Sequence, residues 1–201
     1  MKDSVNAPTD SAALDQAFVT ARTANKFIAR PVDDAILRRL YELYKWGPTS
    51  LNCQPGRVVF LRTKTAKAKL APALTVANRD KTLAAPVVAI IAYDTRFYDH
   101  LVTQAPHRPQ ARAMFASNEA LAQETAFRNG TLQGGYLMIA ARLLGLDAGP
   151  MSGFDAQAVN EAFFGDGRVR ANFLVNLGYA DASGTHPRGP RLDFDEAVRL
   201  E

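Results

Sequence analysis

Trp46-Gly-Pro-Thr-Ser-Leu-Asn-Cys-Gln-Pro-Gly-Arg57 concentrates hydroxyl and amide side chains in a segment punctuated by proline and glycine. That composition is typical of a turn. Helical periodicity over residues 33–45 precedes the segment and the apolar run Val58–Leu61 follows it, so it joins a helix to a strand. Because ligands often bind where regular elements meet, we expect this opening turn, residues 46–57, to hold something polar.

Apolar residues recur at helical or strand spacing along the rest of the chain. The pattern predicts helices over residues 14–23, 33–45, 63–73, 78–83, 119–144 and 156–163. It predicts strands over residues 58–62, 87–93, 148–151 and 172–179. The stretch 96–110 lacks periodicity and should be a mobile loop with a short helix. We expect residues 1–10 to be a flexible arm and residues 11–201 to form a single domain.

Three glycines, Gly130, Gly134 and Gly135, lie inside the longest predicted helix. Each costs up to about 1 kcal/mol relative to alanine, so a close approach by another group should compensate. Another helix or a ligand could make that approach, and we favour another helix.

Composition excludes several classes of protein. The chain has 201 residues, of which 47% are hydrophobic, so it is long enough to bury a core. Its 24 basic and 20 acidic residues are dispersed, which argues against a nucleic-acid partner. The only cysteine, Cys53, cannot form an internal disulfide, residues 1–13 are too polar for a signal peptide, and the run Leu83–Tyr93 is too short to span a membrane. We therefore expect a cytoplasmic protein with no membrane partner.

Common catalytic motifs are missing from the sequence. It contains no phosphate-binding loop, no Gly-x-Gly-x-x-Gly after a strand and no Gly-x-Ser-x-Gly. The histidines, His100, His107 and His186, are too scattered to suggest a metal site. What remains is a set of polar clusters at element junctions, and we expect no bound metal.

Together these clusters resemble the nitroreductase superfamily of FMN flavoproteins, and the resemblance spans nearly the whole chain. The matching segments are Arg22-Thr-Ala-Asn25, Pro48-Thr-Ser-Leu-Asn-Cys-Gln-Pro55, Asn78-Arg-Asp-Lys81, Pro150-Met-Ser-Gly-Phe154 and Arg188-Gly-Pro190. Within the superfamily, the segments 45–50, 124–129 and 149–155 are similar to the malonic semialdehyde reductase branch, which is linked to pyrimidine degradation.

The resemblance implies an α+β fold in which a mixed, largely antiparallel sheet is flanked by helices. It also implies an interlocked homodimer with FMN at the interface between the two chains. It gives the opening turn a specific meaning, as one wall of an FMN site, with Cys53 at a variable position and chemically inert.

The resemblance also implies roles for individual residues. Guanidinium groups bind phosphate in bidentate fashion, so Arg22 and Arg188 suit the FMN phosphate. Lys81 suits the ring edge that becomes negative on reduction. Taken singly, each of these residues also fits an exposed ion pair, a cap or a turn. The predicted cofactor-binding residues are Arg22, Thr23, Asn25, Pro48, Thr49, Ser50, Asn52, Gln54, Asn78, Lys81, Ser152, Gly153 and Arg188.

The activity implied is an NAD(P)H-dependent oxidoreductase, with NADPH or NADH as hydride donor and malonic semialdehyde as acceptor. Because the flavin performs the redox step, no catalytic side chain is predicted. One alternative keeps the flavin but reduces nitroaromatics, quinones or enones. Another is a flavin-binding protein without turnover.

Overall fold

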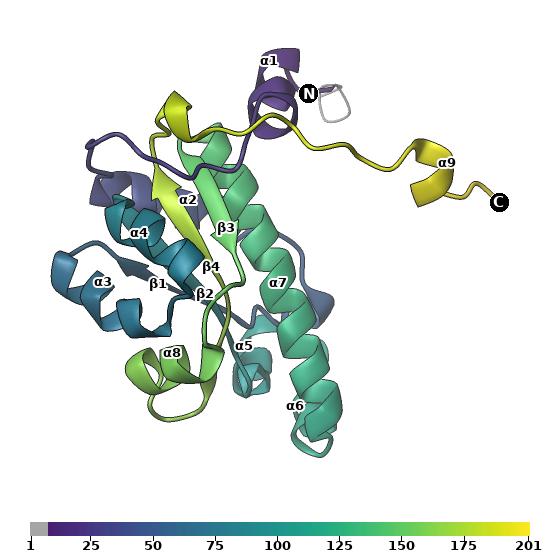
Figure 1. Ribbon diagram of the computed structural model, residues 1–201. Helices are drawn as coiled ribbons and strands as arrows, with labels where there is room; N and C mark the ends of the chain where they lie inside the picture. The colour runs from purple at the N-terminus through teal and green to yellow at the C-terminus, as the bar shows by residue number, and fades with distance from the viewer. Residues whose placement is uncertain (1–7) are drawn as a thin grey trace.

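Two largely buried strands form the centre of the molecule (Figure 1). The computed structural model describes residues 8–201, and residues 1–7 of the predicted arm lie outside the described residues. Strand β2, Val87–Asp94, pairs with β4, Val169–Gly178. Strand β1, Gly56–Leu61, pairs with β2, and β3, Asp147–Met151, pairs with β4, so the order is β1-β2-β4-β3.

Every ladder in this sheet is antiparallel. The sequence predicted a mixed, largely antiparallel sheet. Within residues 8–201, parallel pairing is limited to one isolated bridge between Thr23 and Ala148. The four predicted strands are confirmed. Each strand also includes residues outside its apolar run, because backbone pairing does not depend on side-chain polarity.

Helices cover both faces of the sheet (Figure 1). Their bounds are α1 Ser11–Leu14, α2 Asp34–Tyr44, α3 Lys64–Leu70, α4 Val76–Ala84, α5 Leu101–Gln104, α6 Ala111–Ala116, α7 Glu119–Leu143, α8 Ala156–Phe163 and α9 Phe194–Ala197. Alternate residues of a strand point to opposite faces. Accordingly Val87, Ala89 and Ile91 pack with α2 and α7, whereas Val88 and Ile90 pack with residues of α3 and α8.

The first helix ends earlier than predicted. After α1 the chain forms one π-helical turn, Asp15–Val19, instead of continuing to residue 23. Both the backbone N–H and the hydroxyl of Thr20 donate to the Asp15 carbonyl, at 2.7 and 2.9 Å. A threonine hydroxyl that takes a backbone acceptor competes with continued helix, so the element stops there. In the 96–110 stretch two short helical elements form, Phe97–His100 and α5, where one was expected.

The glycines of α7 approach the sheet rather than another helix, which corrects the packing that we favoured. A Cβ added at Gly130 would lie 2.9 Å from the Tyr93 Cβ, and one at Gly134 would lie 2.5 Å from the Phe173 Cζ. A Cβ at Gly135 would meet nothing within 4 Å. Helix α7 can therefore lie close against β2 and β4 only because positions 130 and 134 have no side chain.

Candidate functional site

Four arginines surround a cavity of about 350 Å³ near the C-terminal end of α7. Arg22 follows the π-helical turn, Arg142 lies in the last turn of α7, and Arg188 and Arg191 lie in the C-terminal segment. Within residues 8–201, none of the four forms an ion pair with a carboxylate. Loss of hydration and the neighbouring guanidinium charges lower the pKa of Arg188. A bound anion would relieve this repulsion.

Neutral carbonyl groups hold these arginines in place. Arg188 Nη2 donates to the carbonyls of Phe18, Val19 and Ala21. Arg22 Nη1 donates to the Ala21 carbonyl at 2.9 Å, and Arg142 Nη1 donates to the Ala17 carbonyl at 3.0 Å. The buried Nε of Arg142 has no hydrogen-bond partner within the described residues. The cluster, defined as Arg22, Arg142, Arg188 and Arg191, thus retains its positive charge, and one of its buried N–H donors has no partner in residues 8–201.

A second polar group lies next to the arginine cluster. Asn25 lines the same cavity, and its Oδ1 lies 3.4 Å from Lys81 Nζ. Asn78 Nδ2 donates to the Gly153 carbonyl at 3.0 Å, and Ser152 is exposed beside it. The structure therefore brings predicted residues from α4 and from the segment after β3 to one region.

The backbone explains why the N-terminal segment reaches this region. Thr23 bridges to Ala148, and the N–H of Ala24 donates to the Ala148 carbonyl at 3.1 Å. A Cβ at Gly149 would clash with the Ala24 carbonyl oxygen, so glycine is required for this approach. The pairing places Arg22, Thr23 and Asn25 along the edge of β3.

The opening turn is held in an uncommon backbone conformation. Leu51, Asn52 and Gln54 have φ angles of 52°, 53° and 41°, although none is glycine. This left-handed region costs about 1–2 kcal/mol per residue. The Thr49 hydroxyl accepts the Gln54 N–H at 3.1 Å, and Gln54 Nε2 donates to Asn52 Oδ1 at 2.8 Å. Pro48 and Ser50 are exposed at the start of the turn.

Within one chain the opening turn lies far from the arginine cluster. The N–H of Ser50 donates to Asn129 Oδ1 at 2.9 Å, whereas Arg142 belongs to the cluster. Both Asn129 and Arg142 lie on α7, and a helix rises about 1.5 Å per residue, so they are roughly 20 Å apart. A single chain therefore presents the predicted residues as two separate half-sites.

Three further polar residues escaped the sequence reasoning. Arg142 joins the predicted arginines, while Asn129 and Gln133 bind the backbone of the opening turn. A basic residue in the last turn of the long helix was one available signal. The repeated amide–glycine pairs Asn129-Gly130 and Gln133-Gly134 were another.

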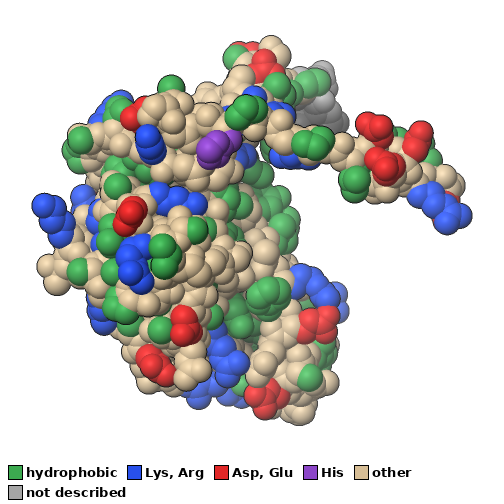
Figure 2. Space-filling model, viewed as in Figure 1, with side chains coloured by type: hydrophobic (Ala, Val, Ile, Leu, Met, Phe, Trp, Pro, Cys, Tyr) green, Lys and Arg blue, Asp and Glu red, His purple; other side chains and the backbone are tan. Residues whose placement is uncertain are grey.

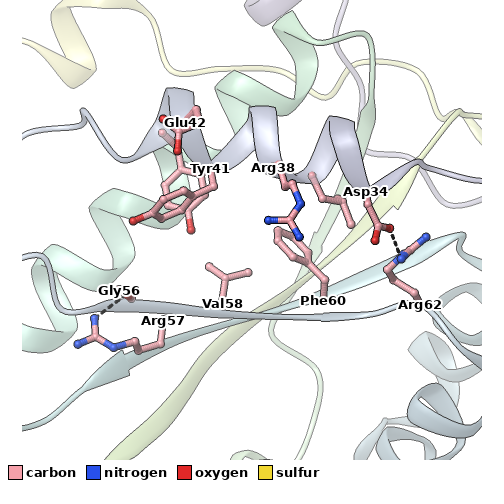
Figure 3. A pocket seen from close by; sticks show the side chains of 11 residues that line it. Asp34, Arg38, Tyr41, Glu42, Gly56, Arg57, Val58, Phe60 and Arg62 are labelled. Atoms are coloured by element: carbon pink, nitrogen blue, oxygen red, sulfur yellow. Dashed lines mark hydrogen bonds and ion pairs between the residues drawn. The ribbon is translucent and has the colours of Figure 1, made fainter.

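A separate groove of about 970 Å³ runs between α2 and β1 and contains none of the predicted cofactor residues. Figure 3 shows Arg38 and Tyr41 on α2 facing Val58 and Phe60 on β1. Arg62 forms an ion pair with Asp34 at one end of the groove. Strand β1, which forms one wall of the groove, is an edge strand of the sheet.

Other features limit the chemistry available. Cys53 is buried, and burial, despite a hydrogen bond with Thr49, raises the pKa of its thiol to about 11. A protonated thiol is a poor nucleophile. Residues 8–201 contain no group of three His, Cys, Asp or Glu side chains placed to hold a metal ion. The same residues include no helix that is long and apolar enough to cross a membrane.

Comparison with known proteins identifies the family of this chain. Residues 19–179 match the model of the nitroreductase family. The chain belongs to the nitroreductase family. A Stenotrophomonas maltophilia (strain R551-3) protein with the provisional name NADH dehydrogenase/NAD(P)H nitroreductase is 56% identical over 191 residues, covering 95% of this chain and 97% of that protein.

Solved structures show the same nitroreductase fold. A nitroreductase-like protein of Bacillus subtilis superposes with a TM-score of 0.85 at 23% identity, covering 96% of this chain and 100% of that one. A second such protein, from Exiguobacterium sibiricum and in complex with FMN, has a TM-score of 0.82 at 20% identity, covering 96% and 99%. The expected α+β nitroreductase fold is thus confirmed.

Proposed function

We propose that this family member binds FMN and uses it as an NAD(P)H-dependent oxidoreductase. The observation that carries the proposal is the arginine cluster, whose positive charge has no acidic partner within residues 8–201. A phosphate dianion matches it in charge and can accept bidentate hydrogen bonds from guanidinium groups. The provisional name of the Stenotrophomonas relative and the FMN complex of the Exiguobacterium protein support the same choice.

The side chains would bind and orient the cofactor rather than react. Bound FMN supplies hydride exchange between NADPH or NADH and a second substrate. Arg22, Arg188 and Arg142 would hold its phosphate, with the Thr23 hydroxyl and Asn25 close by. Lys81, beside Asn25, would stabilise the negative charge that the ring gains on reduction. Asn78, Ser152 and Gly153 would contact the ring edge.

The two separate half-sites support a homodimeric enzyme with FMN between its chains. In this arrangement the arginine cluster of one copy and the opening turn of the other, with Pro48, Thr49, Ser50, Asn52 and Gln54, complete one site. Helix α7 exposes apolar side chains that a second copy would cover: Leu121, Phe127, Leu132, Tyr136 and Leu143. Burying such a surface favours association.

The C-terminal segment would interlock the two copies. Residues 191–201 project from the body of the molecule (Figure 1), and Leu192, Phe194 and Leu200 are exposed. Acidic side chains gather on this segment (Figure 2). Val58 and Phe60 give the groove beside β1 an apolar floor for the partner's segment, and Arg38 on α2 offers it a positive charge.

The acceptor we propose is malonic semialdehyde, reduced to 3-hydroxypropanoate in pyrimidine degradation. The alternative, reduction of nitroaromatics, quinones or enones, is favoured by the name of the Stenotrophomonas relative. A flavin-binding protein without turnover is a third possibility. In each case the partner is a small molecule and not nucleic acid or a membrane, and the setting is cytoplasmic.

Anaerobic stopped-flow experiments separate these functions. Purified protein reconstituted with FMN is mixed with NADPH or NADH, and bleaching of the flavin absorbance is followed. The reduced protein is then mixed with malonic semialdehyde or a nitroarene. Rapid bleaching, followed by reoxidation that is faster with malonic semialdehyde than with the nitroarene, supports the proposal. Reoxidation by malonic semialdehyde that is slow and no faster than by the nitroarene supports the general reductase. Bound flavin that is not bleached supports the flavin-binding protein without turnover. Failure to retain FMN refutes all three functions.

A further inference from the structure

Resting on the proposed function, we infer that Asn129 and Gln133 of α7 are positioning residues that hold the opening turn in its FMN-binding conformation. Neither side chain is in the arginine cluster or in the predicted set of cofactor contacts. They act through the backbone of the turn, at its beginning and its end. The inference joins three observations: a turn with positive φ angles, two buried amides that bind it, and two glycines that place those amides.

The two amides bind the turn at both ends. Asn129 Oδ1 accepts the Ser50 N–H at 2.9 Å, and Gln133 Oε1 accepts the Gly56 N–H at 2.7 Å. Between them lie Leu51, Asn52 and Gln54, the residues with positive φ. Few L residues keep this conformation unless the surroundings impose it. Fixing both ends supplies that constraint.

Because both amides are buried, the loss of either hydrogen bond would leave a polar group without a partner. Asn129 and Gln133 are only 3% and 6% exposed, so water does not readily replace a lost partner. Asn129 Nδ2 also donates to the Thr125 carbonyl at 2.8 Å, which fixes the orientation of the amide and points its oxygen at Ser50. The acceptor at this position is thus set by α7 itself.

The glycines explain how a helix side chain can reach a backbone amide of the turn. Asn129 and Gln133 are four residues apart and therefore lie on the same face of α7. Gly130 and Gly134, the residues that follow them, let the helix lie against Tyr93, Ile91 and Phe173 of the sheet. The two amide–glycine pairs therefore have linked roles. The glycines let α7 pack closely on the sheet, and this packing brings the amides within reach of the turn.

Other contacts also hold the turn, but through different groups. Asn52 Nδ2 donates to the Gln104 carbonyl at 2.9 Å, and Gln54 Nε2 donates to Gln104 Oε1 at 3.0 Å. Arg57 Nη1 donates to the Gln54 carbonyl at 3.0 Å, and its Nη2 donates to Asp94 Oδ2 at 2.9 Å. This clamp fixes carbonyl groups, whereas Asn129 and Gln133 satisfy N–H groups. Neither Arg57 nor Gln104 accepts from the Ser50 or Gly56 N–H, so loss of the amides should free the two ends of the turn even with those contacts intact.

The test compares Gln133→Met with Gln133→Glu, because glutamate keeps an acceptor for the Gly56 N–H and methionine of similar length offers only a weak one. Asn172→Ala is the matched control, since it removes a 2.7 Å hydrogen bond from Asn172 to Thr131 on α7 that does not touch the turn. Each variant is titrated with FMN by fluorescence quenching. Hydrogen exchange of the Gly56 amide is measured in the same proteins without cofactor.

We expect Gln133→Met to weaken FMN binding about tenfold or more, the equivalent of one unsatisfied buried donor. Its Gly56 amide should exchange faster. Gln133→Glu, which keeps an acceptor for that N–H, should lose less FMN affinity and less amide protection than Gln133→Met, and Asn172→Ala should resemble the wild type in both measurements. If the wild type binds FMN and Gln133→Met binds it equally well, the positioning role is refuted and the proposed function stands. If the wild type does not bind FMN, the proposed function fails, and the positioning role fails with it.

Discussion

At the scale of single residues, the arginine cluster places four guanidinium groups around one cavity, and none of them pairs with a carboxylate within residues 8–201. Asp94 shows the opposite case: this buried carboxylate accepts hydrogen bonds from Arg57, Arg168 and the Arg96 N–H. Arg168 binds it through two nitrogens, at 2.8 and 2.9 Å. The Asp94 network is therefore satisfied and structural, whereas the cluster is available to a ligand.

Arg188→Met should weaken FMN binding on the order of tenfold, because a charge-assisted hydrogen bond to phosphate is lost. Riboflavin lacks the phosphate, so its affinity should not change. Fluorescence titration with both ligands measures the difference. Arg112→Met is the control, because Arg112, on α6, pairs with Asp99, away from the arginine cluster and from the C-terminal segment. Equal losses for FMN and riboflavin would contradict the phosphate assignment.

Asp94→Asn should lower the free energy of unfolding by about 1–2 kcal/mol at neutral pH. The free energy of unfolding of the variant should also fall less steeply than that of the wild type as pH is lowered. Burial alone would raise the pKa of Asp94, but hydrogen bonds and the charges of Arg168 and Arg57 outweigh it, so the pKa is lowered. A lowered folded-state pKa stabilises the fold above the unfolded value and loses that contribution as pH falls. Urea unfolding of both proteins between pH 7 and pH 3 checks this. If the free energies of unfolding of the two proteins fall in parallel with pH, Asp94 is not responsible for the loss of stability in acid.

At the scale of elements, the sequence predicted most of what periodicity encodes. The helix predicted over 119–144 forms as α7. Its signals are local: apolar residues recur along the segment, and Gly145, with a φ of 76°, ends the helix. The end of the first helix was predicted wrongly, because the Thr20 hydroxyl decides it locally. Strand order and the role of Asn129 depend on contacts between distant residues, which periodicity does not contain. The predicted cofactor residues remain a prediction, although the structure places them in two coherent groups.

Gly134→Ala should destabilise the protein by about 1–3 kcal/mol through overpacking. The new Cβ would lie 2.5 Å from Phe173 and 2.9 Å from Ile91, and this cost exceeds the gain in helix propensity. Thermal unfolding of the apoprotein measures the change. Gly135→Ala is the matched control, because a Cβ there meets nothing within 4 Å. Equal melting temperatures for the two variants would show that α7 does not need the close approach.

At the scale of the whole molecule, the exposed apolar surface on α7 and on the C-terminal segment argues for a second copy. Phe127 is 52% exposed and Leu200 is 83% exposed. Helix α9 is stabilised by a capping box between Asp193 and Glu196, so the projecting segment keeps local order. A segment that is ordered but lacks packing is suited to dock on a partner.

Removal of residues 192–201 should weaken the dimer and, with it, FMN retention. The truncated chain keeps all four residues of the arginine cluster, so loss of the cofactor would follow from loss of the partner and not of a phosphate ligand. Light scattering after size-exclusion chromatography, with and without FMN, gives the mass. A second variant, Leu200→Asp with Phe194→Asp, removes the apolar contacts without shortening the chain. A truncated protein that remains a dimer would contradict the proposed interlocking.

The pairing of β2 with β4 has a further consequence, for folding during synthesis. The two strands lie at residues 87–94 and 169–178, and β3 pairs only with β4. On the ribosome, residues up to the end of α8 can emerge while the centre of the sheet still lacks β4. Pairing of strands that are distant in sequence is slow, so the edge of β2 that pairs with β4 lacks its partner until the chain is nearly complete. Chaperone binding during that interval should therefore concentrate on β2.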